Sequence, residues 1–124
     1  MPTHSVLKYH IVWCTKYRRK FLSSEKQKSL KDIIQEKCDQ VGYILEAIEV
    51  MEDHIHCFVS SDVKTPVHRI VSQLKSYSAY KLKILYPELL TRVPSIWTRS
   101  YYSGTVGFIS EEIVNRYIEN QKHV

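Results

Sequence analysis

The sequence predicts a single α+β domain, because two kinds of segment alternate along its 124 residues. Short runs rich in β-branched and aromatic side chains are typical of strands. Two longer stretches carry apolar side chains three and four residues apart, which is typical of amphipathic helices. The hydrophobic share of 44% and the charged share of 25% are ordinary for a globular protein, so the composition does not predict disorder.

The first strand and the first helix are expected over residues 5–15 and 24–41. The segment 5–15 (SVLKYHIVWCT) has the composition of a strand. Ser23 can cap the start of the helix with its hydroxyl group. Gly42 ends the helix, because glycine readily adopts the left-handed conformation of a C-terminal cap.

A β-hairpin is expected next. Residues 43–51 (YILEAIEVM) and 54–60 (HIHCFVS) both have the composition of strands. The short polar break between them, Glu52 and Asp53, leaves room for a tight connection.

The second half of the chain predicts another helix and another strand. Thr65 and Pro66 open the helix, with the proline at its first position. Pro87 and Pro94 bound an irregular stretch. Residues 96–103 (IWTRSYYS) then have the composition of a fourth strand.

A last helix is expected over residues 110–124. The segment before it, residues 104–109, is flanked by Gly104 and Gly107. Glycine tolerates large changes in φ and ψ, so we expect this segment to be flexible.

The order of elements over residues 1–103 is β-α-β-β-α-β, which predicts a ferredoxin-like fold. In that fold an antiparallel sheet carries two helices on one face. The opposite face would be open unless the C-terminal helix or a partner covers it.

The net charge of +5 favours a polyanionic partner, either nucleic acid or an acidic membrane surface. No apolar run reaches the ~20 residues needed to span a bilayer, and the N-terminus lacks an apolar signal core, so we expect a cytoplasmic protein. Cys14, Cys38 and Cys57 show no CxxC spacing and are expected to be reduced and mostly buried.

His54 and His56 alternate with apolar residues in the strand expected over 54–60. Both imidazoles should point to one face, about 6.6 Å apart along the strand, while Ile55 and Cys57 point to the core. Two imidazoles on one face can share a divalent metal ion. The spacing is unspecific, however, and two half-exposed histidines without a metal would show the same pattern.

Tyr117 and Gln121 lie one turn apart in the last helix and share a face. A phenol becomes a nucleophile once deprotonated, and an amide oxygen is an acceptable ligand for a hard cation such as Mg²⁺. A tyrosine on an apolar stripe is more often part of a core, and a glutamine near a chain end is more often solvated. Tyr101 and Tyr102 are the other tyrosines that could act as the nucleophile.

Four segments in order resemble the TnpA-type HUH single-tyrosine transposases of the single-strand insertion sequences of bacteria and archaea. The segments are YHIVWCTKYRRKFL (9–22), MEDHIHCFVS (51–60), IWTRSYYSGTVG (96–107) and YIENQ (117–121). The resemblance spans nearly the whole chain, and the ordered set is far more specific than the His-x-His spacing alone.

The resemblance implies that His54, His56 and Gln121 hold a divalent metal, Mg²⁺ or Mn²⁺. It implies that Tyr117 attacks a DNA phosphate to form a 5′-phosphotyrosine and leave a free 3′-OH. The family acts as a homodimer in which the tyrosine helix of one subunit completes the histidine pair of the other. The glycine-flanked segment 104–109, with Gly104 and Gly107, would then be the hinge that lets the last helix cross over or return. The family's substrate is single-stranded DNA with hairpins near the ends of the mobile element.

Several basic and aromatic side chains are candidates for contact with such DNA, the former with phosphates and the latter with unpaired bases. The basic residues are Lys16, Arg18, Arg19, Lys20, Arg69 and Lys75, and the aromatic residues are Tyr17, Trp97 and Tyr101. The same side chains could instead be surface charge or core packing.

Two other functions fit parts of the sequence. A non-catalytic single-stranded nucleic-acid-binding module could use the ferredoxin-like sheet, but it has no need of two histidines on one face. A replication-initiator or relaxase nuclease of the same HUH type is a further alternative, although those proteins are usually longer.

Overall fold

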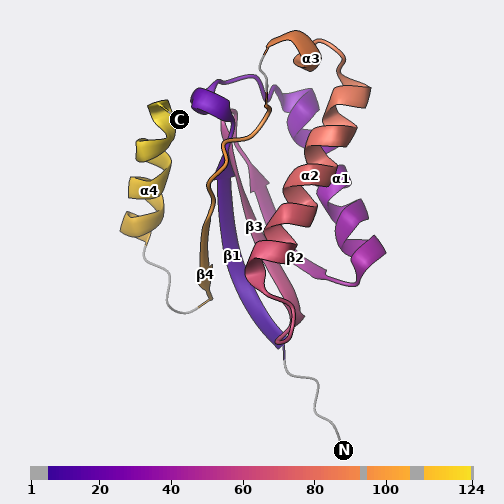
Figure 1. Cartoon of the computed structure of the whole chain (residues 1–124), viewed down its shortest axis with the longest axis vertical. Coiled ribbons are helices and arrows are strands. Elements are labelled where there is room, and N and C mark those ends of the chain that lie inside the picture. The colour runs from indigo at the N-terminus through magenta and orange to yellow at the C-terminus, as the bar shows by residue number, and fades with distance from the viewer. Residues whose placement is uncertain (1–5, 93–94, 107–110, 124) are drawn as a thin grey trace, which may run out of the picture.

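The structure of the chain is a computed structural model, which describes residues 6–92, 95–106 and 111–123. The strands are β1 (Val6–Cys14), β2 (Ile44–Val50), β3 (His54–Asp62) and β4 (Tyr102–Thr105). They form one antiparallel sheet in the order β2-β3-β1-β4. Helices α1 (Ser24–Val41) and α2 (Val67–Leu85) cover one face, and α4 (Glu111–Glu119) lies on the other side (Figure 1). The predicted ferredoxin-like fold is confirmed.

The ends of α1 lie where the sequence predicts them. The side chain of Ser23 accepts a hydrogen bond from the backbone N–H of Lys26, as an N-terminal cap does. Gly42 has φ of 85°, in the left-handed region, and its N–H donates to the carbonyl of Cys38. The helix therefore ends at a glycine, which adopts this conformation without steric strain.

The hairpin of β2 and β3 sets where the histidines lie. Val50 pairs with Ile55, and the N–H of Met51 donates to the carbonyl of His54 at 2.8 Å. This tight connection makes His54 the first residue of β3, so His54 and His56 occupy the end of the strand that adjoins the turn.

Alternation along the strands divides the sheet into two faces. Trp13 of β1 and Cys57 of β3 are buried in the main core together with residues of α1 and α2. Val12 faces the other way and packs in a second, smaller core with Val114 and Ile118 of α4. As predicted, Cys57 points away from the histidines.

The chain's cysteines are all free and buried, which confirms the expectation for them. Burial raises the pKa of Cys14 to about 12 and that of Cys38 to about 11, so both are thiols at neutral pH. Of the helices within the described ranges, none is both long and apolar enough to cross a bilayer.

The fourth strand begins later than the sequence predicts. β4 starts at Tyr102, and within residues 96–101 Trp97 forms an isolated bridge with Thr15. Trp97 is buried, and its indole N–H donates a hydrogen bond to the hydroxyl of Ser78 at 3.1 Å. The strand-like composition of this segment reflects burial against α2 and not pairing in the sheet.

Two smaller predictions in the second half are corrected. Pro66 is the N-terminal cap of α2 and not its first helical residue. The stretch expected to be irregular between the prolines contains a short helix, α3 (Leu89–Arg92).

The segment predicted to be a hinge begins within a strand, at Gly104. This glycine lies inside β4 and pairs with His10 of β1, so the chain is still held by the sheet at this point. Gly107 and Ser110 lie outside the described residues. The last helix begins by Glu111 and, after Glu119, continues as a 3₁₀ helix, η2 (Asn120–His123).

Candidate functional site

His54 and His56 share one pocket on the sheet face opposite α1 and α2. Their ring centroids are 5.0 Å apart, so the prediction that both point to one face is confirmed. The pocket has a volume of about 660 Å³, and α4 closes it with Val114 and Ile118 among other side chains. Phe58, the next residue on the same face of β3, lines it as well.

His54 is held by a buried carboxylate. Its Nδ1 lies 2.7 Å from Oδ1 of Asp53, and Arg18 Nε donates to the other carboxylate oxygen at 3.1 Å. Burial alone would raise the pKa of Asp53, but the hydrogen bond with His54 and the charge of Arg18 outweigh it and keep that pKa below its ordinary value. Asp53 is therefore a carboxylate that accepts from both neighbours.

His56 is held by another histidine. Its Nδ1 lies 3.0 Å from Nε2 of His10, which is buried in β1. Burial, reinforced by neighbouring His54 and His10, lowers the pKa of His56 to about 4, and Glu49 opposes this only in part. Burial also lowers the pKa of His10. Both rings are therefore neutral at physiological pH, as a metal-ligating imidazole must be.

The two histidines fit a divalent metal. Each Nδ1 already has a hydrogen-bond partner, which leaves the two Nε2 atoms as the available ligand atoms. Within the described part of the chain, no three His, Cys, Asp or Glu side chains are grouped to hold a metal. A complete site therefore needs a ligand of another type, as Gln121 would be, or one from another molecule.

Tyr117 and Gln121 meet each other but do not meet the histidines within one chain. The hydroxyl of Ser100 lies 3.0 Å from the Tyr117 hydroxyl and donates to Gln121 Oε1 at 2.8 Å. Neither Tyr117 nor Gln121 lines the histidine pocket. The face that they share in α4 and η2 is thus confirmed, whereas their approach to the histidines stays a prediction.

The Tyr117 phenol is half-buried, beside Tyr102 at a ring-centroid distance of 6.2 Å. Burial raises its pKa to about 12, against the opposing effect of the hydrogen bond with Ser100. In this position the phenol is protonated and is no nucleophile at neutral pH.

The raised pKa of Tyr117 predicts a loss of stability at alkaline pH. Unfolding returns the phenol to an ordinary pKa near 10, so the unfolded chain releases the proton first as the pH rises. Stability from this group is complete below about pH 10 and is lost as the pH rises toward about 12. Stability from the buried cysteines is lost over the same range, so the share of Tyr117 is measured as the difference in urea unfolding between wild type and Tyr117→Phe. At about pH 11, against a reference near pH 8, this share should be roughly 1 kcal/mol.

Tyr117→Phe should remove this share of the alkaline loss. Tyr80→Phe is the matched control, because Tyr80 is 62% exposed in α2 and should leave the loss unchanged. Equal alkaline losses in wild type and Tyr117→Phe would show that the phenol is not held as described.

The predicted basic turn is strained and exposed. Tyr17 and Arg18, within the 3₁₀ helix η1 (Lys16–Arg18), have φ of 59° and 52°, unusual for residues other than glycine. The Tyr17 ring is 47% exposed and lies within 5.1 Å of Lys16 Nζ and 5.6 Å of Arg19 Cζ. An exposed ring between cations is suited to stack on an unpaired base.

Arg18 differs from the other basic residues of this turn. Besides Asp53 it binds the end of α4, donating to the carbonyl of Ile118 at 3.4 Å and lying 3.8 Å from the Glu119 carboxylate. Its side chain is only 18% exposed. Lys20 and Arg19 are exposed, so contact with phosphate by these two stays a prediction.

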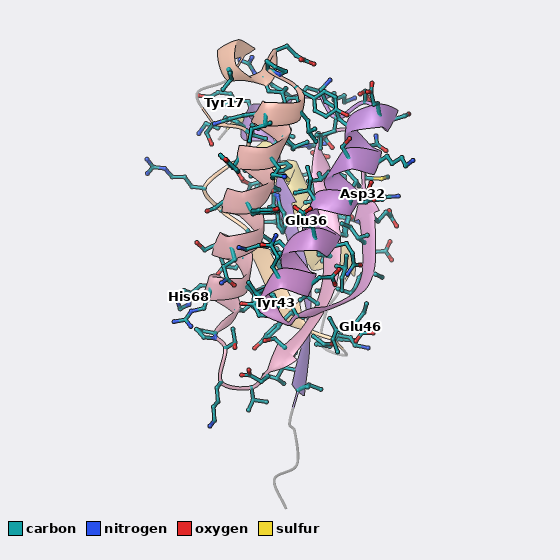
Figure 2. The ribbon with its side chains drawn as sticks, turned by 90° about the vertical axis from the view of Figure 1, so that its right-hand side faces the viewer. Tyr17, Asp32, Glu36, Tyr43, Glu46 and His68 are labelled. Carbon is teal, nitrogen blue, oxygen red and sulfur yellow. The ribbon has the colours of Figure 1, made fainter. Side chains whose placement is uncertain are left out.

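The remaining candidates for DNA contact are scattered. Figure 2 shows Tyr17 and His68 near opposite ends of the molecule, and Arg69 follows His68 in α2. Lys75 donates to the carbonyls of Thr98 and Ser100, and burial lowers its pKa to about 8.

Two of the aromatic candidates differ from the expectation. Trp97 is 4% exposed, so its predicted role in base stacking is wrong. Tyr101 is partly buried against the main core. Tyr17 is the exposed ring of the three.

Sequence reasoning missed His10 and Ser100. Both are polar residues in segments of strand-like composition, and their partners are set by strand register and by the path of residues 96–101. One available signal was that His10 breaks the apolar run of β1, since a buried histidine usually has a partner.

Comparison with known proteins identifies the family. The family model described as "Transposase IS200 like" matches residues 3–121. The ISDra2 transposase TnpA of Deinococcus radiodurans is 34% identical over 117 residues, which cover 93% of this chain and 84% of the relative. The transposase for insertion sequence element IS200 of Salmonella typhimurium is 31% identical over 116 residues, which cover 92% of this chain and 76% of the relative.

Solved structures also match the fold. A crystal structure of a proposed transposase from Deinococcus radiodurans has a TM-score of 0.90 at 32% identity, covering 100% of this chain and 97% of its own. A REP-associated tyrosine transposase bound to a REP hairpin has a TM-score of 0.62 at 14% identity, covering 94% and 68%, and shares the fold. By the family match and the two transposase relatives, the chain belongs to the IS200-like transposase family.

Proposed function

We propose that the chain cleaves and rejoins single-stranded DNA at the ends of an insertion sequence through a 5′-phosphotyrosine at Tyr117. Membership of a transposase family supports DNA processing in general. The observation that supports the finer proposal most is the histidine pair, in which both Nδ1 atoms are engaged and both Nε2 atoms are left for a ligand.

The proposed reaction is a balanced transfer of one phosphoester bond. The Tyr117 phenol loses its proton as its oxygen attacks phosphorus, and the bond from phosphorus to the 3′ oxygen breaks. The 3′ oxygen takes up a proton and leaves as a 3′-OH, so no proton is gained or lost overall. The phosphotyrosine retains the phosphoester, so the 3′-OH of another strand can attack it and regenerate the phenol without ATP.

His54 and His56 are the proposed metal ligands, with Gln121 as the third. A bound Mg²⁺ or Mn²⁺ supplies a positive charge that stabilises developing negative charge on the reacting phosphate. The chain's own part is to keep His56 neutral, to orient both imidazoles through Asp53 and His10, and to line one side of the pocket with apolar side chains.

We propose further that two subunits share each site. Tyr117 and Gln121 are held at Ser100, away from the histidine pocket of the same chain. Completing the site then needs α4 to move, or the α4 of a second subunit to reach the pocket. The packing of α4 is small, since Val114 and Ile118 are its buried apolar contacts within Glu111–Glu119.

The proposed substrate is single-stranded DNA with a hairpin end. The net charge of +5 favours a polyanion, and the exposed Tyr17 ring beside Lys16 and Arg19 is suited to an unpaired base next to phosphates. The REP-associated tyrosine transposase, which shares the fold, was solved bound to a REP hairpin, and this supports the use of a DNA hairpin as the probe in the test.

The proposal is tested with labelled hairpin oligonucleotides incubated with the protein and Mg²⁺ or Mn²⁺. We expect a covalent protein–DNA band on a denaturing gel, a free 3′-OH product, and loss of both in EDTA. Binding that survives EDTA, with no covalent band at any metal concentration on a panel of hairpins, would favour a non-catalytic binding module instead.

A further inference from the structure

We propose that His10 is a positioning residue for the metal site. Its Nε2 accepts a hydrogen bond from the Nδ1–H of His56, which leaves His56 Nε2 unprotonated and directed at the ligand position. This inference rests on the proposed function, since it assigns a role within the same site. His10 itself is not proposed as a ligand.

The register of the sheet brings the two rings together. Val12 pairs with His56 and His10 with Phe58, so His10 and His56 are diagonal neighbours on one face of β1 and β3. Their facing nitrogens, His10 Nε2 and His56 Nδ1, are 3.0 Å apart, a normal hydrogen-bond distance.

The His10 ring is fixed by its surroundings. It stacks on Phe58 with a centroid distance of 4.4 Å and an interplanar angle of 6°, and the edge of Tyr102 lies 6.4 Å away. Only 8% of the residue is exposed. A ring clamped in this way presents one nitrogen to His56 in a constant orientation.

The hydrogen bond decides which His56 nitrogen carries the proton. A neutral imidazole has one N–H, and a metal binds the nitrogen that lacks it. If His10 Nε2 accepts, the proton of His56 lies on Nδ1, and its Nε2 lone pair is free. If His10 donated instead, His56 Nε2 would carry the proton and could not bind the metal.

The two ligands would then be prepared by different partners. Asp53 accepts from His54 Nδ1 at 2.7 Å, which fixes the same tautomer through a carboxylate. His10 does this for His56 without adding negative charge to the pocket. The two histidines therefore both present Nε2 to the metal. The Nδ1–H of His54 is hydrogen-bonded to the Asp53 carboxylate, and that of His56 to the neutral His10 ring.

The first test is the tautomer of His56 in the metal-free protein, read from long-range ¹H–¹⁵N NMR spectra. We expect the Nδ1–H form in wild type. His10→Gln should keep it, because the amide oxygen of glutamine can lie near the place of Nε2 and accept. His10→Phe keeps an aromatic ring on Phe58 but removes the acceptor, and should give a substantial Nε2–H fraction.

The second test is Mn²⁺ affinity, measured by electron paramagnetic resonance. His10→Phe should bind Mn²⁺ about 10- to 100-fold more weakly, the usual effect of removing the partner of a metal-ligating histidine, and His10→Gln should recover most of the loss. Phe58→Leu loosens the stacking but keeps the acceptor, so it should weaken Mn²⁺ binding less than His10→Phe does.

The outcomes separate the two proposals. Wild-type protein that binds no Mn²⁺ would overturn the proposed metal site and this inference with it. Normal Mn²⁺ binding by both wild type and His10→Phe would overturn the inference alone. An Nε2–H tautomer of His56 in wild type would also overturn it, and this readout needs no variant to fold.

Discussion

Tyr117→Phe should abolish the covalent protein–DNA adduct, with a loss of about 10⁴-fold or more in the rate of strand cleavage. The phenol oxygen is the proposed attacking atom, and phenylalanine has none. The variant should fold normally, because the ring still packs beside Tyr102 and loses only the hydrogen bond with Ser100. The measurement is the covalent band formed from a labelled hairpin with Mg²⁺.

Tyr102→Phe is the matched control for this experiment. Tyr102 is the neighbouring phenol, so the variant tests whether the adduct depends on one particular hydroxyl. It should retain the adduct. A covalent band of wild-type intensity from Tyr117→Phe would show that the nucleophile is another residue.

The second large effect is the recovery of activity from two inactive subunits. His56→Ala and Tyr117→Phe should each be inactive as homodimers. If two subunits share each site as proposed, a purified heterodimer of the two should reach about half the wild-type yield of adduct. One of its two sites would then combine an intact histidine pair with an intact tyrosine. Two different affinity tags allow that heterodimer to be isolated.

The reciprocal heterodimer separates the two arrangements. It carries both substitutions on one chain and none on the other. If sites are shared between subunits, neither site of this heterodimer is complete and no adduct forms. If each chain uses its own tyrosine, the unchanged chain of the reciprocal heterodimer stays active. The heterodimer of His56→Ala with Tyr117→Phe is then inactive. Activity in the reciprocal heterodimer alone would therefore overturn the shared site.

The parts of the fold that the sequence predicted well are those set by local chemistry. The ends of α1 follow from a hydroxyl at Ser23 and from the left-handed conformation at Gly42. The hairpin follows from two strand-like runs with a short polar break. Alternation on β3 predicted that His54 and His56 share a face, and their rings do.

The parts that were missed depend on contacts distant in sequence. The segment around Trp97 has the composition of a strand, but its indole is used in the core against Ser78, and pairing starts only at Tyr102. Composition cannot separate these two ways of burying an aromatic residue.

The candidate site shows the same division. Helical spacing placed Tyr117 and Gln121 on one face, as observed, but could not place that face at Ser100. His10 became visible as a partner of His56 only through the register of β1 on β3. Register joins residues 46 positions apart, and no local pattern encodes it.

One guanidinium joins three separate parts of the chain. Arg18 belongs to a backbone turn held in an uncommon conformation, and it binds both the carboxylate behind His54 and the last turn of the C-terminal helix. A nucleic-acid phosphate that withdrew Arg18 would remove one hydrogen-bond donor from each of these two acceptors at once. Substrate capture at the turn, the orientation of one imidazole and the attachment of the C-terminal helix would then change as one event.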